Sequence, residues 1–269
     1  MDVLETLDNL QTAATDDEKK MNNKPKYNFD KLKMYFGEDY KIANINISIP
    51  TIGDILDIGE DKFYTALKPF LNNPTSVRVF LYDVLHKDWN KTSDIELFYI
   101  LMHVSSDKEP LKLMFKDTNF SDFELRSIRD EDNEHFVLVS NSQNLIITED
   151  NLDELLEYVR SVMNVHPKVE KAKGKTTKLW ILQEDRTKAL NKKNEEDSTL
   201  LPLISSCINH PGFKYKLEEL KKVNICQFMD SVKRIQKYEQ GTAAIKGMYS
   251  GMISGKDLPE DLINFMGDV

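Results

Sequence analysis

The chain has 269 residues, of which 40% are hydrophobic and 30% charged, with 9 Pro and 10 Gly. This balance is typical of a folded protein and excludes collagen-like and wholly disordered classes. The formal net charge of −9 argues against a protein that wraps nucleic-acid phosphates, because such binding needs a basic surface. The chain also lacks a charge-free window of about 18 residues and a basic, then apolar, leader, so we expect neither a membrane span nor a signal peptide.

Residues 1–26 are polar and of mixed charge, which predicts a mobile tail, with order beginning near Tyr27. The apolar residues of this tail lie at helical spacing, a pattern typical of one short helix that forms on a partner. They are Val3, Leu4, Leu7 and Leu10.

Residues 40–50, YKIANINISIP, alternate apolar and polar side chains and end on proline, which predicts a strand or a small hairpin. The next stretch, 51–73, begins with Thr51 three residues before Asp54, a spacing typical of a capping box. We expect it to be helical with a break near Gly59.

Two further apolar helices are predicted, SVRVFLYDVLHKDW at 76–89 and SDIELFYILMHV at 93–104, the second opened by Ser93 with Glu96 three residues on. Between residues 110 and 148 the period changes to short β-rich runs separated by polar turns such as DEDNE, which predicts an antiparallel meander.

The stretch 148–165 shows a clear helical pattern, with Thr148 as N-cap, acidic residues in the first turn and one apolar stripe. The Lys-rich segment 166–176 has no apolar period and predicts a linker. The segments beyond it read as helices separated by an HPGF turn. The sequence thus predicts a mainly helical α+β fold: a mixed α/β N-terminal domain with a small antiparallel sheet at 27–165, and an all-α C-terminal domain at 177–269.

Motifs for catalysis, cofactors or metals are weak throughout the sequence. Gly174-Lys175-Thr176 lacks the upstream glycine of a phosphate loop, since position 169 is valine. The five histidines never pair at the spacing of a helical metal site, and neither Cys207 nor Cys226 has a CxxC partner. We therefore expect a non-enzymatic protein with no cofactor, no metal and two reduced, buried thiols, although ligands brought together only by folding would escape this search.

The stretch 175–193 surrounds Trp180 with basic residues, a pattern found on nucleic-acid-binding faces. The alternative is a linker followed by a charged helix with Trp180 in the core. The basic residues are Lys175, Lys178, Arg186, Lys188, Lys192 and Lys193.

The segment NICQFMDSVKRIQKYE carries one apolar helical stripe, which is either core or an adaptable binding groove. Further on, GMYSGMISG repeats glycine every fourth residue, but the charged Lys246 and Lys256 bracket it and disfavour pairing in a membrane. The remaining alternatives are fraying of the helix or close packing against another chain. The candidate partner-binding residues are Ile225, Phe228, Met229, Val232, Ile235, Gly247 and Gly251.

Four segments together resemble proteins encoded among the tail morphogenesis genes of tailed bacteriophages of low-GC Gram-positive hosts, namely tail assembly chaperones and tail structural proteins. The likeness spans residues 27–268. It is carried by IPTIGDILDIGEDKF, DIELFYILM, LLPLISSCINHPGFKYKLEELKKVNICQFMDSVKRIQKYEQ and DLINFMGD.

This resemblance implies a protein that acts through protein surfaces, in the cytoplasm of the host cell or in the virion. It would hold a tape-measure protein until tube subunits polymerise around it, or remain as a structural component of the tail or of the head–tail connector. Its partners would be tape-measure or tube proteins, or a second copy of the chain. A nucleic-acid-binding accessory protein is the alternative of a different class.

Overall fold

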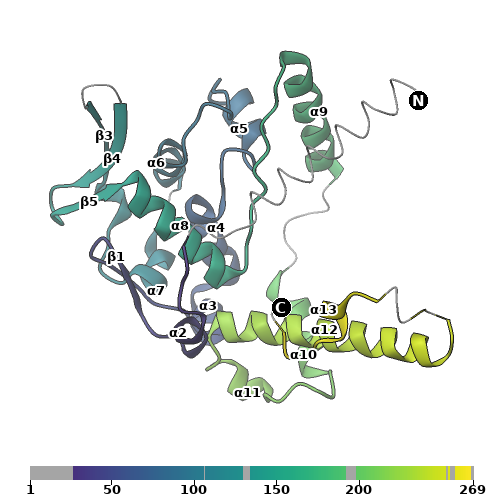
Figure 1. Ribbon diagram of the computed structural model, residues 1–269. Helices are drawn as coiled ribbons and strands as arrows, with labels where there is room; N and C mark the ends of the chain where they lie inside the picture. The colour runs from purple at the N-terminus through teal and green to yellow at the C-terminus, as the bar shows by residue number, and fades with distance from the viewer. Residues whose placement is uncertain are drawn as a thin grey trace, which may run out of the picture. The chain divides into compact units, whose positions relative to one another are not determined.

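The computed structural model describes residues 27–105, 107–129, 134–191, 198–252, 254 and 258–267. The expectations for the tail at 1–26, for most of the DEDNE turn and for Lys192, Lys193, Gly255 and Lys256 therefore lie outside the described residues. Residues Lys31–Val269 form one compact unit and Met1–Asp30 another. The predicted fold class is confirmed, since the chain is mainly helical with two small antiparallel sheets (Figure 1).

The larger unit begins with helix α2 (Lys31–Phe36) and the predicted hairpin, strands β1 (Tyr40–Ile42) and β2 (Ile45–Ile47). Ala43 and Asn44 connect the strands with φ values of 47° and 68°, as a tight two-residue hairpin turn requires. The alternating isoleucines point inward, because Ile42, Ile45 and Ile47 are all buried.

The expected helix with a break is also confirmed, as α3 (Ile52–Ile58) and α4 (Glu60–Leu71). Thr51 and Asp54 form the capping box, and Gly59 breaks the helix with a φ of 98°, a conformation that favours glycine. Gly53 allows a close approach of two backbone segments, because a Cβ there would lie 2.7 Å from the carbonyl oxygen of Lys221.

Helix α5 (Arg78–Asp83) is shorter than the predicted 76–89 segment, whereas α6 (Asp94–Val104) has the predicted capping box of Ser93 and Glu96. Three short helical turns follow before the meander. They are η1 (Glu109–Leu111), α7 (Lys112–Phe115) and η2 (Phe120–Asp122).

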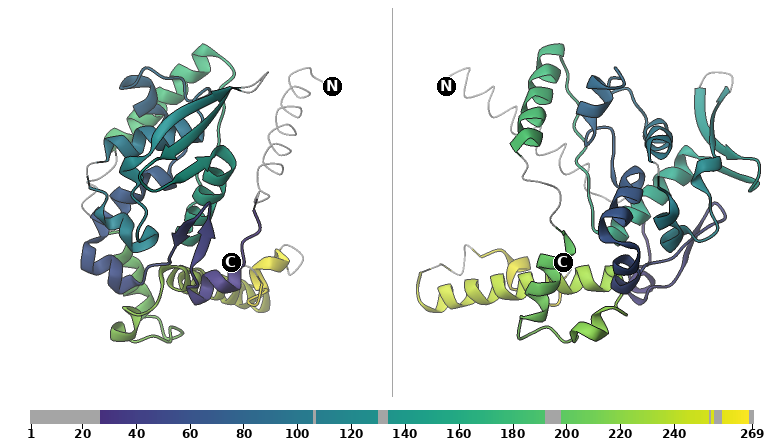
Figure 2. Two further views of the ribbon diagram at one scale, coloured as in Figure 1. Left: turned by 90° about the vertical axis from the view of Figure 1, so that its left-hand side faces the viewer. Right: turned by 180° about the vertical axis from the view of Figure 1, so that it is seen from behind.

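The meander consists of β3 (Glu124–Arg129), β4 (Glu134–Ser140) and β5 (Leu145–Thr148), paired antiparallel in the order β3-β4-β5, as predicted. Thr148 caps α8 (Glu149–Met163) through a bond from the Asn151 amide. Figure 2 shows α8 running beside the sheet, and α8 also packs on α4. The Arg160 guanidinium donates to the carbonyl oxygens of Phe70 and Asn72, at 3.0 and 2.6 Å, so it caps the end of α4.

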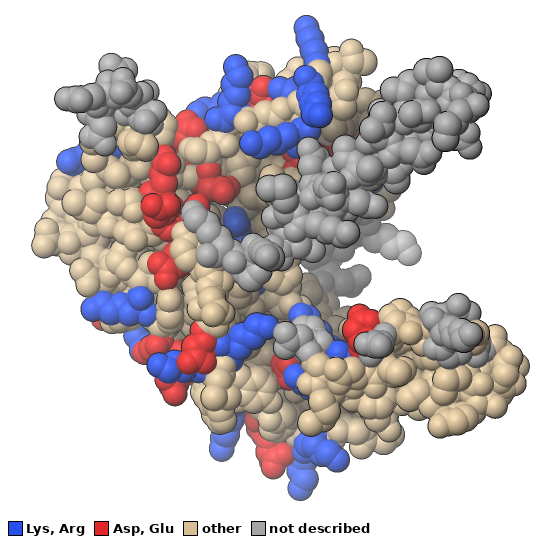
Figure 3. Space-filling model, in the orientation of Figure 1, with Lys and Arg blue, Asp and Glu red and all other residues tan. Residues whose placement is uncertain are grey.

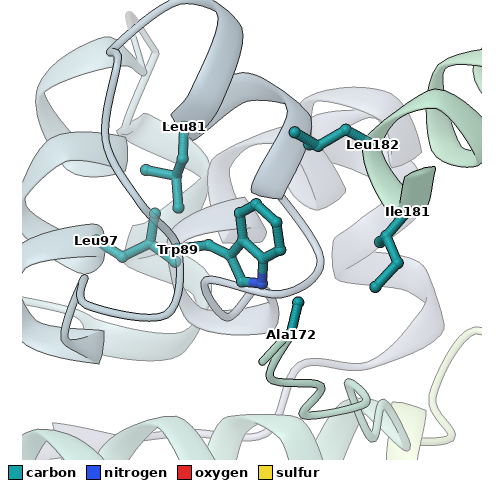
Figure 4. Packing of buried hydrophobic residues seen from close by; sticks show 6 residues of the cluster. All are labelled: Leu81, Trp89, Leu97, Ala172, Ile181 and Leu182. Carbon is teal, nitrogen blue, oxygen red and sulfur yellow. The ribbon is translucent and has the colours of Figure 1, made fainter. Parts of the chain in front are cut away.

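Helix α9 (Lys175–Asn191) packs on α5 through apolar and ionic contacts. The apolar contact is a cluster in which five buried side chains from α5, α6, α9 and the segment before α9 gather around Trp89 (Figure 4). In the ionic contact, Arg78 donates to both carboxylate oxygens of Asp185 at 2.5 and 3.0 Å and to Glu170 at 2.5 Å. The predicted linker 166–176 therefore contributes Ala172 and Glu170 to these contacts.

The alternative to a nucleic-acid-binding face placed Trp180 of the charged helix in the core. That placement is wrong, because the Trp180 side chain is 68% exposed. Ile181 and Leu182 fill the interface with α5 instead, and Trp180 points about 100° away from Ile181 and about 160° away from Leu182. The sequence alone did not distinguish the two tryptophans, of which Trp89 is the buried one.

The chain ends in α10 (Leu200–Ile208), α11 (Leu217–Leu220), α12 (Ile225–Tyr249) and α13 (Glu260–Ile263). The start of α12 is joined to the start of α3: the Ile225 amide donates to the Pro50 carbonyl, and the Ile52 amide donates to the Val223 carbonyl, each at 2.9 Å. These bonds connect the two predicted domains within one compact unit, and the division at 166–176 stays a prediction.

Candidate functional site

The His, Cys, Asp and Glu side chains of the described residues do not gather, in groups of three or more, into a cluster that could hold a metal ion. Burial raises the pKa of the Cys207 and Cys226 thiols, which disfavours the thiolate that a cysteine nucleophile requires. His210 is used locally: its Nε2 lies 2.9 Å from Glu239, and the Gly212 amide donates to its Nδ1.

Two shallow grooves lie on the surface of the described residues. One, of about 550 Å³, is lined by Lys108, Lys112 and Lys116 together with Glu109, Leu111 and residues 117–120. Lys112 pairs with Glu109 and Lys116 with Asp39, at 2.9 and 2.6 Å. The other groove, of about 280 Å³, runs along α9 beside Trp180. Neither groove is lined by His or Cys, and the available lysine charge of the larger one is partly neutralised.

Three basic residues of α9 form ion pairs, two of them with the rest of the unit. Lys178 pairs with Asp88 at 2.5 Å and Arg186 pairs with Asp83 at 2.5 Å. Lys188 pairs with Glu184 on the same helix, at 2.6 Å. A nucleic-acid face needs cations that neutralise phosphates, whereas these three are already matched by carboxylates of the same chain.

The first five candidate residues occupy the beginning of α12, where the helix contacts α2 and α8. Ile225 and Phe228 are fully buried, and Val232 is 8% exposed; we call these three residues the proximal stripe. Met229 and Ile235 are half-buried at its edges. The proximal stripe therefore belongs to the core of the folded chain, and it presents no open groove to a partner.

Gly247 and Gly251 form the end of α12. The Met252 amide donates to the Gly247 carbonyl and the Gly251 amide to the Met248 carbonyl, each at 3.0 Å. With Gly251 at a φ of 73°, these two bonds make a Schellman motif. Gly251 is exposed with open space around it, so its role in the described structure is to end the helix.

On α12, Gly241 also allows a close approach, and its sequence context did not reveal this role. A Cβ at this position would lie 2.6 Å from the Leu262 carbonyl oxygen and 2.6 Å from Cε1 of Phe265. Residues 258–267, which we call the strap, thus fold back on α12 and include α13. The aromatic rings of Tyr238 and Phe265 lie 5.4 Å apart beside Gly241.

The strap lies against part of a second apolar stripe of α12. Counting about 100° per residue, this stripe lies roughly opposite the proximal stripe. We call it the distal stripe, and its members recur every third or fourth residue, the spacing of a helix-packing seam. They are Tyr238, Gly241, Ile245 and Met248. The apolar pattern of α12 therefore changes face midway along the helix, and the stripe predicted from NICQFMDSVKRIQKYE does not continue to the end of α12.

The far end of α12 and the strap expose several large apolar side chains. Within the described part of 198–267, exposed large apolar residues are about as numerous as buried ones, whereas buried residues clearly outnumber them in 31–191. The exposed residues of α12 and the strap are Tyr238, Tyr249, Met252, Ile263, Phe265 and Met266, and Leu201 on α10 and Leu217 on α11 are the other two in 198–267. Figure 3 shows few charged side chains over the far end of α12 on the face in view. Such a concentration is typical of a protein-binding surface.

A comparison with family models finds a match to the second domain of YomV over residues 191–266. YomV is a Bacillus phage-region protein, so the match indicates a phage-derived protein. The matched range contains the distal stripe and nearly all of the strap. No curated protein sequence and no solved structure matches the chain. None of the described helices has the length and apolar character that a membrane span requires.

Proposed function

We propose that this protein is a non-enzymatic bacteriophage assembly factor that binds other phage proteins through the far end of α12 and the strap. The observation that carries this proposal is the group of exposed apolar side chains there, within the range that matches a phage-region domain. The net charge of −9 would keep such an apolar surface soluble.

The finer proposal is a tail assembly factor whose partner is the tape-measure or tube protein. A tape-measure protein that waits for its tube has apolar helix faces open to water, and a second apolar helix face is the surface that covers them. The distal stripe of α12 offers such a face, with Tyr249 and Met252 extending it beyond Met248.

A structural component of the virion tail or head–tail connector would use the same surface permanently. Proteomics of purified particles separates the two alternatives. We expect few or no copies in mature virions for an assembly factor, and copies in fixed stoichiometry for a structural component.

The nucleic-acid-binding alternative is disfavoured by the ion pairs of Lys178, Arg186 and Lys188. We expect no retention of the protein on immobilised DNA at low salt. Salt-sensitive retention that is lost on replacing these three residues would support that alternative instead.

The proposed binding is tested by co-expression with a fragment of the tape-measure protein from the same phage. Tyr249→Asp with Met252→Asp places charge on two side chains that are 83% and 85% exposed, so folding should be retained. We expect co-purification to be lost. The matched control is Val104→Asp, at an exposed apolar residue at the end of α6, which should leave co-purification unchanged. Equal capture by both variants would contradict the proposed surface.

A further inference from the structure

The strap is seated on α12 by backbone and aromatic contacts around one glycine. Gly241 brings the α12 backbone close to the Leu262 carbonyl and to the Phe265 ring. Phe265 also lies against Tyr238, with ring centroids 5.4 Å apart. Arg234 extends the contact, since its Nη1 lies 3.4 and 3.5 Å from the carbonyl oxygens of Phe265 and Gly267. The seat, formed by Arg234, Tyr238 and Gly241, thus accepts a close backbone approach at Leu262, an aromatic ring three positions later, and two carbonyl oxygens at the end of the strap.

The strap fills this seat incompletely. Its helix α13 has only four residues, and one isolated helical turn has little stability of its own. Its apolar side chains are covered only in part, with Ile263 42%, Phe265 36% and Met266 92% exposed. The hydrogen bonds from Arg234 are at the long end of the accepted range.

The surface of α12 continues beyond the strap contact. Ile245 and Met248 are half-buried on the same face as Gly241, and Tyr249 and Met252 follow at the helix end, largely exposed. In Figure 1 and in the reverse view of Figure 2, α13 lies alongside only part of α12, and α12 runs on past it. A longer helix in the same seat would therefore cover apolar area that the strap leaves open.

We infer that the strap is an internal competitor that occupies, on α12, the place of a partner helix that packs an aromatic side chain beside Gly241 and Tyr238. This inference rests on the proposed binding function and adds the chemistry of the partner and its regulation. A segment tethered to the same chain has an effective concentration in the range of millimolar for a short connection. The strap consequently prevents weakly binding, unrelated helices from binding to α12. A partner that covers the full length of the distal stripe displaces it.

The test uses the full-length chain and a labelled peptide of residues 258–267, LPEDLINFMG, as the probe, with binding followed by fluorescence anisotropy. In the wild-type chain, the attached strap competes with the peptide. Phe265→Ala in the chain weakens the attached strap at a partly exposed position, so folding is retained. We expect this variant to bind the peptide several-fold more tightly than the wild-type chain does.

A second substitution closes the seat. Adding Gly241→Ala to the Phe265→Ala chain should abolish peptide binding, because the new Cβ would collide with the peptide backbone. Alanine is the better helix former, so α12 itself is not weakened, and Gln240→Ala at a neighbouring exposed position is the control that should retain binding. Equal peptide affinity of wild-type and Phe265→Ala chains, or binding that survives Gly241→Ala, would overturn the inference. Because the probe is the strap peptide, this result is independent of whether a tail protein is captured, so the proposed function can fail separately.

Discussion

Phe228 decides whether the first half of α12 is core or a binding groove. Its side chain is 0% exposed, and a buried phenylalanine removes about 150–250 Å² from water. At about 25 cal/mol per Å² this burial is worth about 4–6 kcal/mol as an upper bound, and measured Phe→Ala losses in cores are about 3–5 kcal/mol. We therefore expect Phe228→Ala to lower the free energy of unfolding by about 3–5 kcal/mol.

The assay is urea denaturation followed by circular dichroism, for the wild-type chain, Phe228→Ala and the control Tyr249→Ala. Tyr249 lies on the same helix but is 83% exposed, so its replacement should change the free energy of unfolding by less than about 0.5 kcal/mol. An unchanged denaturation midpoint for Phe228→Ala, together with loss of partner capture, would refute the assignment of this residue to the core. That result would instead support the binding groove that the sequence analysis gave as the alternative to core.

Three further predictions concern other parts of the unit. The Lys178 ammonium holds the pKa of Asp88 below its usual range. The pair therefore stabilises the fold above about pH 4, and this contribution is lost as the pH falls through the folded-state pKa of Asp88. Lys178→Met should lower stability to urea at pH 7, and the difference from wild type should vanish in strong acid. Trp180→Phe should shift the intrinsic fluorescence to shorter wavelength, because only the buried Trp89 then remains; an unchanged spectrum would count against the exposed position of Trp180. Gly251→Ala should cost about 1–2 kcal/mol in thermal denaturation, since an L-residue must adopt the left-handed conformation there without any new clash.

Local chemistry explains which elements the sequence predicted correctly. The capping boxes at Thr51 and Ser93, the break at Gly59 and the N-cap at Thr148 each depend on residues within a few positions of one another. The hairpin and the meander likewise follow from alternation over a few residues. These signals need no knowledge of distant contacts, and they gave the correct fold class.

Positions that depend on distant partners were not predictable in the same way. Trp180 and Ile181 are adjacent apolar residues on one helix, and only the position of α5 determines which of them is buried. Gly241 has no special φ, so its role is visible only once Leu262 is placed against it. Gly251 could have been recognised from the sequence as a glycine just beyond a helical pattern, a common signal for a helix end.

The two faces of α12 give the candidate site its physical basis. The proximal stripe fixes one half of the helix in the core, and bonds to Pro50 and Tyr35 hold its first turn. The distal stripe is therefore presented by a helix that is already formed, so a partner does not bear the entropy of ordering it. A flexible segment with the same apolar residues would bind more weakly for that reason. Replacing Phe228 should accordingly weaken partner binding through loss of this anchoring, even though Phe228 contributes no surface to the partner.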